Sequence, residues 1–214
     1  MPPHVIPADL KTIKAYIKRA EELDLDRSTP TSRLVAYYCR QFAVERGLTA
    51  NATSSESKSC LMQIMDELEK ERELIGNGFS REEAYTICLD FAQNIFDKAD
   101  QEDRNGKANQ STARTFYAAA IFYEILEQFD KYKEDESDNV TRRKYSKWKA
   151  AQILNAIKSG WFNKGSSAGN SGDRVNADNL DDAIELVRFG LVALQTKEID
   201  LARKRLQEAL SKLG

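Results

Sequence analysis

Apolar residues recur at every third or fourth position through most of this chain of 214 residues. The pattern is clearest in the run 95–129, and it continues in the basic and aromatic segment 142–161. This spacing is typical of helices that bury one face, whereas a half-buried strand alternates at every second position. No alternating run lies between turn-forming residues. We therefore predict an all-α protein.

Glycines and capping signals divide the first 163 residues into six expected helices. Gly47 is interpreted as the end of the second helix, and Ser80 with Glu83 as a capping box that begins the fourth. Short connections favour the packing of successive helices into bundles. We expect two three-helix bundles, at about 9–77 and 80–162, packed together as one N-terminal unit over residues 1–163.

The core faces of two helices follow from their apolar stripes. In the third helix the expected stripe is Leu61, Met65 and Leu68. In the sixth helix it is Tyr145, Trp148, Ala151 and Leu154. Residues of one stripe share a helix face and are expected to be buried together.

The composition changes after residue 163. The stretch 164–176 is rich in glycine, serine and asparagine, and is expected to be a flexible linker. Residues 177–214 carry two apolar stripes and predict a helical hairpin. A unit of about 40 residues buries little surface alone, so we expect this hairpin to dimerise. The expected dimer contacts are Leu180, Ile184, Val187, Leu191, Leu194 and Leu206.

The outward face of such a dimer is expected to be basic. Once the apolar stripes are buried, the charged side chains of the hairpin have to face solvent. The accessible basic residues are then predicted to be Arg188, Arg203, Lys204 and Arg205.

The sequence offers little for catalysis. Its single histidine, His4, lies in a segment that we expect to be an unstructured leader. This removes triads and dyads that use histidine, and zinc sites that contain it. Cys39, Cys60 and Cys88 show no paired spacing, and Cys39 and Cys88 are interpreted as buried thiols in a reducing compartment. We predict no catalytic residue, metal site or cofactor, and no enzyme.

Charge and hydropathy exclude further classes. The chain has 32 basic and 34 acidic residues, and lacks the basic cluster expected of a nucleic-acid-binding protein. No apolar run approaches the roughly 20 residues that span a bilayer, and the N-terminus does not resemble a signal peptide. We expect a cytoplasmic protein.

Two surfaces are candidates for binding a partner. On the third helix, Asp66, Glu69 and Glu73 lie beside the apolar stripe. They form either a solvated face or the acidic rim of a groove for a basic, leucine-bearing helix. On the sixth helix, basic residues within 142–149 surround Tyr145 and Trp148. They either cover the rings with their long stems or contact an acidic partner.

Several separated motifs resemble the Vta/LIP family. Val35–Arg40 followed by Phe42 and Ala43 is similar to its second helix. Later signatures are found at 99–106, 115–119 and 143–150. Ala193, Leu194 and the spacing of apolar residues from 202 to 213 resemble its C-terminal VSL hairpin. The resemblance covers nearly the whole chain, in order.

The resemblance implies tandem MIT-type bundles that bind the C-terminal tails of ESCRT-III subunits. Asp66, Glu69, Glu73 and Met62 would contact the tails. The VSL hairpin would form a homodimer and stimulate the AAA ATPase that disassembles ESCRT-III. Its candidate contacts are Arg188, Phe189, Arg203 and Lys204. Such a protein would reach the endosome membrane only through ESCRT-III. Members of the family usually have a long acidic or proline-rich spacer, whereas this chain has a short one.

Two alternatives remain open from the residues alone. A scaffold of helical hairpins like those of TPR proteins would also use alanine- and leucine-rich helix pairs, although no 34-residue period occurs here. A helical enzyme that uses carboxylates is disfavoured by the absence of further histidines and of glycine-rich phosphate loops.

Overall fold

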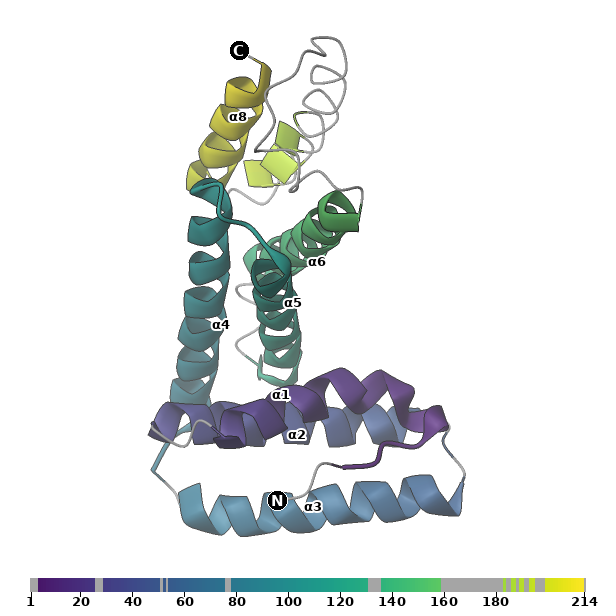
Figure 1. Cartoon of the computed structure of the whole chain (residues 1–214). Helices are drawn as coiled ribbons and strands as arrows, with labels where there is room; N and C mark the ends of the chain where they lie inside the picture. The colour runs from purple at the N-terminus through teal and green to yellow at the C-terminus, as the bar shows by residue number, and fades with distance from the viewer. Residues whose placement is uncertain are drawn as a thin grey trace. The chain divides into compact units, whose positions relative to one another are not determined.

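The computed structural model describes residues 4–25, 29–50, 52, 54–75, 78–130, 136–158, 183, 186–187, 189–190, 193–194 and 199–213. Helices dominate these ranges, and no strand occurs within them, which confirms the prediction of an all-α protein. The elements (Figure 1) are η1 (Ala8–Ile13), α1 (Lys14–Leu25), α2 (Pro30–Thr49), α3 (Ser55–Ile75), α4 (Arg81–Arg104), α5 (Gln110–Glu124), η2 (Ile125–Gln128), α6 (Glu136–Lys158) and α8 (Ile199–Leu213).

The chain forms two compact units. The first unit comprises Met1–Lys98 and Ala118–Glu134, and the second comprises Ala99–Tyr117 and Asp135–Gly214. Their boundary falls inside α4 and α5. The bundle limits expected from the sequence stay predictions, and residues 76–77 and 164–176 lie outside the described ranges.

In the first unit, α2 packs against both α1 and α3 (Figure 1). It is apolar around much of its circumference and buries Val35, Ala36, Cys39, Phe42 and Ala43. Burial on several sides accounts for this pattern, since a helix at the surface needs only one apolar stripe. α2 is therefore the centre of this bundle.

Aromatic contacts continue the core of the first unit beyond the bundle. The ring of Phe129, just after η2, lies 4.7 Å from the ring of Tyr38 on α2 and 5.7 Å from that of Tyr85 on α4. The side-chain amide of Gln128 donates a hydrogen bond to the carbonyl oxygen of Tyr38 at 3.1 Å. Phe129 thus joins three segments that are distant in the sequence.

Local signals set the helix ends where the chain offers a cap. The hydroxyl oxygen of Thr29 accepts a hydrogen bond from the Ser32 amide at 3.2 Å, and Pro30 occupies the first turn of α2. The capping box at α4 is confirmed, because the amides of Ser80 and Glu83 each donate to the other's side chain, at 2.7 and 3.1 Å. Gly106, with φ of 65°, follows the end of α4.

The prediction that Gly47 ends the second helix is wrong. α2 continues to Thr49, and Gly47 is buried within it. A Cβ atom at this position would lie 2.5 Å from Cδ2 of Leu61 on α3. The absent side chain allows α2 and α3 to approach closely, which sequence reasoning mistook for a stop signal.

The expected core face of the sixth helix is correct at Tyr145 but wrong at Ala151 and Leu154. α6 buries Asn139, Thr141, Tyr145, Ser146, Ala150 and Ile153, whereas Ala151 and Leu154 are exposed and Trp148 is half-buried. Thr141 and Ser146 donate hydrogen bonds to the carbonyl oxygens of Ser137 and Arg142, at 2.8 and 2.7 Å. Hydroxyls satisfied within their own helix can be buried, so apolar periodicity gives the wrong face.

The thiols of Cys39, Cys60 and Cys88 are free and buried. The prediction of buried thiols at Cys39 and Cys88 is confirmed. Burial raises the pKa of Cys39 to about 12, and it raises the pKa values of Cys60 and Cys88 as well. All three cysteines are therefore protonated at neutral pH and are poor nucleophiles.

Candidate protein-interaction surfaces

The outer face of α3 combines exposed methionines with carboxylates. Met62 is 65% exposed and Met65 is 42% exposed. Asp66, Glu69 and Glu73 are exposed as well. Helical spacing places all five on one side of α3, and we call them the α3 stripe. The three carboxylates therefore lie beside the exposed methionines.

The prediction that Met65 belongs to the core of α3 is wrong. The buried face consists of Ser57, Cys60, Leu61 and Ile64. Towards the C-terminus this inner face continues with Glu67 and Glu71, which sequence analysis did not consider. The stripe Leu61–Met65–Leu68 was misplaced because an inward-facing carboxylate looks like a surface residue when only hydropathy is considered.

A buried ion cluster explains why these glutamates face inwards. The side chain of Arg40 on α2 is 1% exposed. It pairs with Asp24 of α1, with Glu67 at 3.5 Å and with Glu71 at 2.9 Å. We call these four residues the Arg40 cluster. It ties α1 and α3 to α2, and so holds the α3 stripe on the opposite, outer face of its helix.

The electrostatics of the Arg40 cluster reflect its burial. Desolvation lowers the pKa of Arg40, but the three carboxylates outweigh it, and the net shift is upward. Burial raises the pKa of Glu71 above its ordinary value, despite the opposing effect of Arg40. The arginine is thus permanently charged, whereas burial disfavours the charged form of Glu71.

The expectation that His4 lies in an unstructured leader is wrong. Its ring nitrogens lie 3.1 Å from a carboxylate oxygen of Glu21 and 3.2 Å from one of Glu67. The side chain is largely buried by these contacts. His4 therefore belongs to the first unit, next to the Arg40 cluster. Sequence reasoning missed this because its two partners, Glu21 and Glu67, are distant from it in the sequence.

A pocket of about 400 Å³ opens where the start of α2 faces the end of α3. Its walls include Leu34, Tyr37 and Ile75, together with Phe79 from the segment before α4. Arg72 and Arg81 also line it. The pocket thus combines aromatic and apolar side chains with two arginines, and none of its lining residues belongs to the α3 stripe.

In the second unit, residues of the expected C-terminal hairpin contact α4 and α6. The ring of Phe189 lies 5.0 Å from that of Trp148 and 5.6 Å from that of Tyr145. The amine of Lys204 lies 2.9 Å from a carboxylate oxygen of Asp100. Arg203 is exposed, and Arg188 lies outside the described residues.

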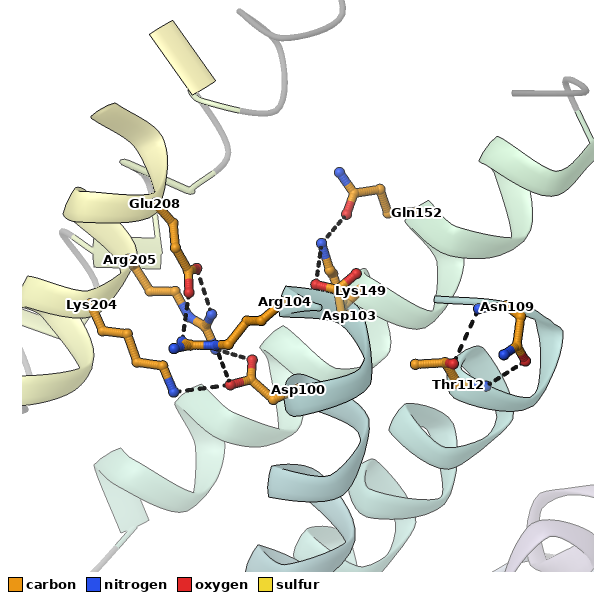
Figure 2. A network of polar contacts seen from close by, with 10 residues as sticks. All are labelled: Asp100, Asp103, Arg104, Asn109, Thr112, Lys149, Gln152, Lys204, Arg205 and Glu208. Atoms are coloured by element: carbon orange, nitrogen blue, oxygen red, sulfur yellow. Dashed lines mark hydrogen bonds and ion pairs between the residues drawn. The ribbon is translucent and has the colours of Figure 1, made fainter. Parts of the chain in front are cut away.

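The prediction that Arg205 is accessible is wrong, since it is 1% exposed. Its guanidinium lies 3.1 Å from Asp100, 2.7 Å from Glu208 and 3.8 Å above the ring of Tyr145. Figure 2 shows Lys204 and Arg205 converging on Asp100, with Arg104 on the same carboxylate. The buried Asp100 is the partner that sequence analysis missed.

Two neighbouring contacts order the same region (Figure 2). Lys149 of α6 lies 2.9 Å from Asp103 of α4 and donates to Gln152 at 2.8 Å. Asn109 caps α5, because its side-chain oxygen accepts from the Thr112 amide at 3.4 Å. One lysine of the basic segment 142–149 thus finds its acidic partner within this chain.

The described dimer candidates differ in exposure. Val187 and Leu194 are 37% and 47% exposed, and Leu206 is half-buried. Ala183, Leu186 and Ala209 form a buried cluster, and a Cβ atom at Gly190 would lie 3.0 Å from Cγ of Leu206. Leu180, Ile184 and Leu191 lie outside the described residues. Dimerisation stays a prediction.

The described part of the chain offers neither a metal site nor a membrane-spanning helix. No group of histidine, cysteine and acidic residues there could hold a metal ion. Across those same ranges, no helix has the length and apolar character to cross a membrane.

Comparison with known proteins assigns the chain to a family. Residues 12–159 match the family described as "Vta1 like". The chain belongs to the Vta1-like family. The resemblance to the Vta/LIP family is thereby confirmed, and an unrelated scaffold of TPR-like hairpins is set aside.

Curated proteins also resemble this Vta1-like chain. It is 40% identical over 159 residues to an Arabidopsis thaliana protein named as a homologue of mammalian LYST-interacting protein 5, covering 70% of this chain and 34% of the relative. It is 30% identical to the vacuolar protein sorting-associated VTA1 homologues of Bos taurus and Homo sapiens, covering 86% and 85% of this chain and 57% of each relative. The chain thus spans between a third and three fifths of these proteins.

The Vta1-like match covers the α3 stripe and the residues of α4 and α6 that contact the C-terminal segment. The α3 stripe, the Arg40 cluster and the residues Asp100, Tyr145 and Trp148 all lie within 12–159. Phe189, Lys204 and Arg205 lie beyond it. Curated members of the family are named as vacuolar protein sorting-associated proteins, which places this chain in a family of protein sorting.

Proposed function

We propose that this chain is a non-catalytic adaptor in vacuolar and endosomal protein sorting. Its N-terminal bundles bind the helical tails of ESCRT-III subunits, and its C-terminal hairpin forms a homodimer and stimulates the AAA ATPase that disassembles ESCRT-III. It acts in the cytoplasm, reaches the endosome membrane through ESCRT-III and needs no cofactor. Family membership and the names of the curated relatives support the sorting role.

The α3 stripe is the observation that carries the first half of this proposal. Methionine side chains adapt to varied apolar partners, and exposed apolar surface bordered by charge is typical of a protein-interaction site. A basic helix that carries leucines complements such a surface in both hydropathy and charge. Exposed ion pairs contribute only about 0–1 kcal/mol each, so the methionines should supply most of the affinity.

Binding of a synthetic ESCRT-III tail helix should depend on the α3 stripe. We expect Met65→Asp to weaken binding about tenfold or more, which corresponds to about 1.4 kcal/mol. Glu69→Lys should weaken binding at low salt and less so at high salt, because screening shortens the reach of surface charges. Fluorescence anisotropy titrations of a labelled peptide measure both effects.

The matched control for the charge reversal is Glu56→Lys. Glu56 is exposed on α3 but lies on a different side of the helix from the stripe. Its reversal changes the net charge equally and should leave the affinity unchanged. An equal loss of affinity in Glu69→Lys and Glu56→Lys would mean that only overall charge matters. Unchanged peptide binding by Met65→Asp would rule out the α3 stripe as the binding site.

The hairpin half of the proposal is tested by ATP hydrolysis. Adding the chain to the ESCRT-III-disassembling AAA ATPase should raise its rate of hydrolysis. Arg203→Asp, at the exposed residue among the described ATPase candidates, should reduce this stimulation severalfold, because it removes a cation from the proposed contact. Lys144→Asp, an equal charge change on exposed α6 surface, is the control. If the parent chain does not stimulate ATP hydrolysis, the proposed role of the hairpin is contradicted.

A further inference from the structure

The buried carboxylate of Asp100 depends on the hairpin for most of its compensation. Its oxygens lie 2.8 Å from Arg104, 2.9 Å from Lys204 and 3.1 Å from Arg205. Two of these three cations come from α8. A buried carboxylate is destabilising unless it is paired. The end of α4 is therefore electrostatically suited to receive a helix with two adjacent cations.

Aromatic surface on α6 completes this receptor. Tyr145 lies beneath the guanidinium of Arg205, at a distance typical of a favourable cation–π contact. The rings of Tyr145 and Trp148 also contact Phe189. The hairpin thus contributes Arg205 from α8 and Phe189 from its earlier segment to one patch, so both of its parts are recognised together.

We infer that Asp100, Tyr145 and Trp148 form a docking site for the hairpin of the same chain, and that docking and binding of the ATPase exclude each other. This inference rests on the proposed function, together with the assignment of Phe189 and Lys204 as candidate contacts of the ATPase. Both side chains are engaged in the docked hairpin, whereas Arg203 stays exposed. An ATPase that needs Phe189 and Lys204 can bind only after the hairpin has left this site.

The chemistry of the docking site suits a reversible contact. Buried ion pairs gain little net stability, because desolvation offsets much of their attraction. The Nε atom of Arg205 is buried without a hydrogen-bond partner, which weakens the docked state further. The apparent affinity of the hairpin for a partner then falls in proportion to the fraction of undocked molecules.

Hydrogen exchange of the α8 amides measures docking directly in the full chain. Asp100→Lys should raise their exchange rates about tenfold or more, because the receptor then repels Lys204 and Arg205. Trp148→Ala, at a half-buried position, should also raise them without introducing a charge. Asp100→Lys combined with Arg205→Asp should restore protection. Asp97→Lys, on an exposed residue of the same helix, should change nothing.

ATPase stimulation tests the exclusion. At subsaturating concentrations, Asp100→Lys and Trp148→Ala should stimulate hydrolysis more strongly than the parent and Asp97→Lys chains. Unchanged α8 exchange in both variants would overturn docking. Faster exchange with unchanged stimulation would overturn the exclusion. Protection of α8 that grows with chain concentration would assign the site to a second copy instead. If no chain stimulates the ATPase, the proposed function fails, while exchange still decides docking.

Discussion

Replacement of Arg40 by methionine should lower the free energy of unfolding by about 3–5 kcal/mol, the usual effect of removing one partner from a buried ion pair. Methionine fills much of the same volume, so little of this loss comes from packing. The loss arises because the carboxyl groups of Asp24, Glu67 and Glu71 lose the cation that compensates them. Urea titrations followed by circular dichroism measure the change.

Three further variants separate charge from packing at this position. Arg40→Lys keeps the charge, but lysine lacks the planar guanidinium that contacts three carboxylates. Its free energy of unfolding should therefore lie between those of the parent chain and Arg40→Met. Adding Glu67→Gln and Glu71→Gln to Arg40→Met should recover much of the stability, since it removes two of the buried charges. Lys58→Met, which removes an exposed cation from α3, is the control. No recovery in the triple variant would show that the Arg40 cluster acts through packing.

Truncation of Phe129 to alanine should destabilise the first unit by about 3–5 kcal/mol, as is usual for a buried phenylalanine. This ring is buried and contacts Tyr38 and Tyr85, and the guanidinium of Arg81 lies 5.4 Å from its centroid. Its loss leaves a cavity where α2, α4 and the end of η2 meet. Thermal and urea unfolding of the variant measure the effect.

Phe129→Leu and Phe79→Ala provide the controls. Phe129→Leu keeps an apolar side chain at the site and should cost less than about 1.5 kcal/mol. Phe79 is exposed, so the same truncation there should stay within about 0.5 kcal/mol. If Phe129→Ala is no worse than Phe79→Ala, the aromatic junction does not hold these segments together. Trp148→Ala should also cost less than Phe129→Ala, because Trp148 is half-buried.

Much of the helical architecture could be predicted from the sequence because its signals are local. Apolar periodicity predicted the helices, and side-chain hydrogen bonds of the kind formed by Ser80 and Glu83 act within a single turn. The same reasoning failed at Gly47, whose role is set by Leu61 on another helix. It also failed at α6, where Thr141 and Ser146 are buried polar residues. Such positions depend on partners that a single segment does not reveal.

The candidate surfaces could be predicted only where they are exposed. Asp66, Glu69 and Glu73 follow from helical spacing, and the structure leaves them free of the core. Arg205 was misjudged because an arginine on a short amphipathic helix is usually solvated, and its partner Asp100 lies 105 positions earlier in the sequence. For the same reason the burial of Arg40 was overlooked, and His4 was wrongly expected to lie in an unstructured leader. A charge's burial depends on distant carboxylates rather than on its own neighbours.

The placement of the three buried thiols provides separate probes for the two units. Cys39, Cys60 and Cys88 all belong to the first unit, whereas Trp148 belongs to the second. A thiol reagent reaches these buried cysteines when the first unit opens, so the rate of thiol modification measures the rate of opening. Indole fluorescence reports on the second unit, to which both tryptophans of the chain, Trp148 and Trp161, belong. The wild-type chain therefore carries an intrinsic reporter in each unit, and the unfolding of each unit can be timed without substituting a residue.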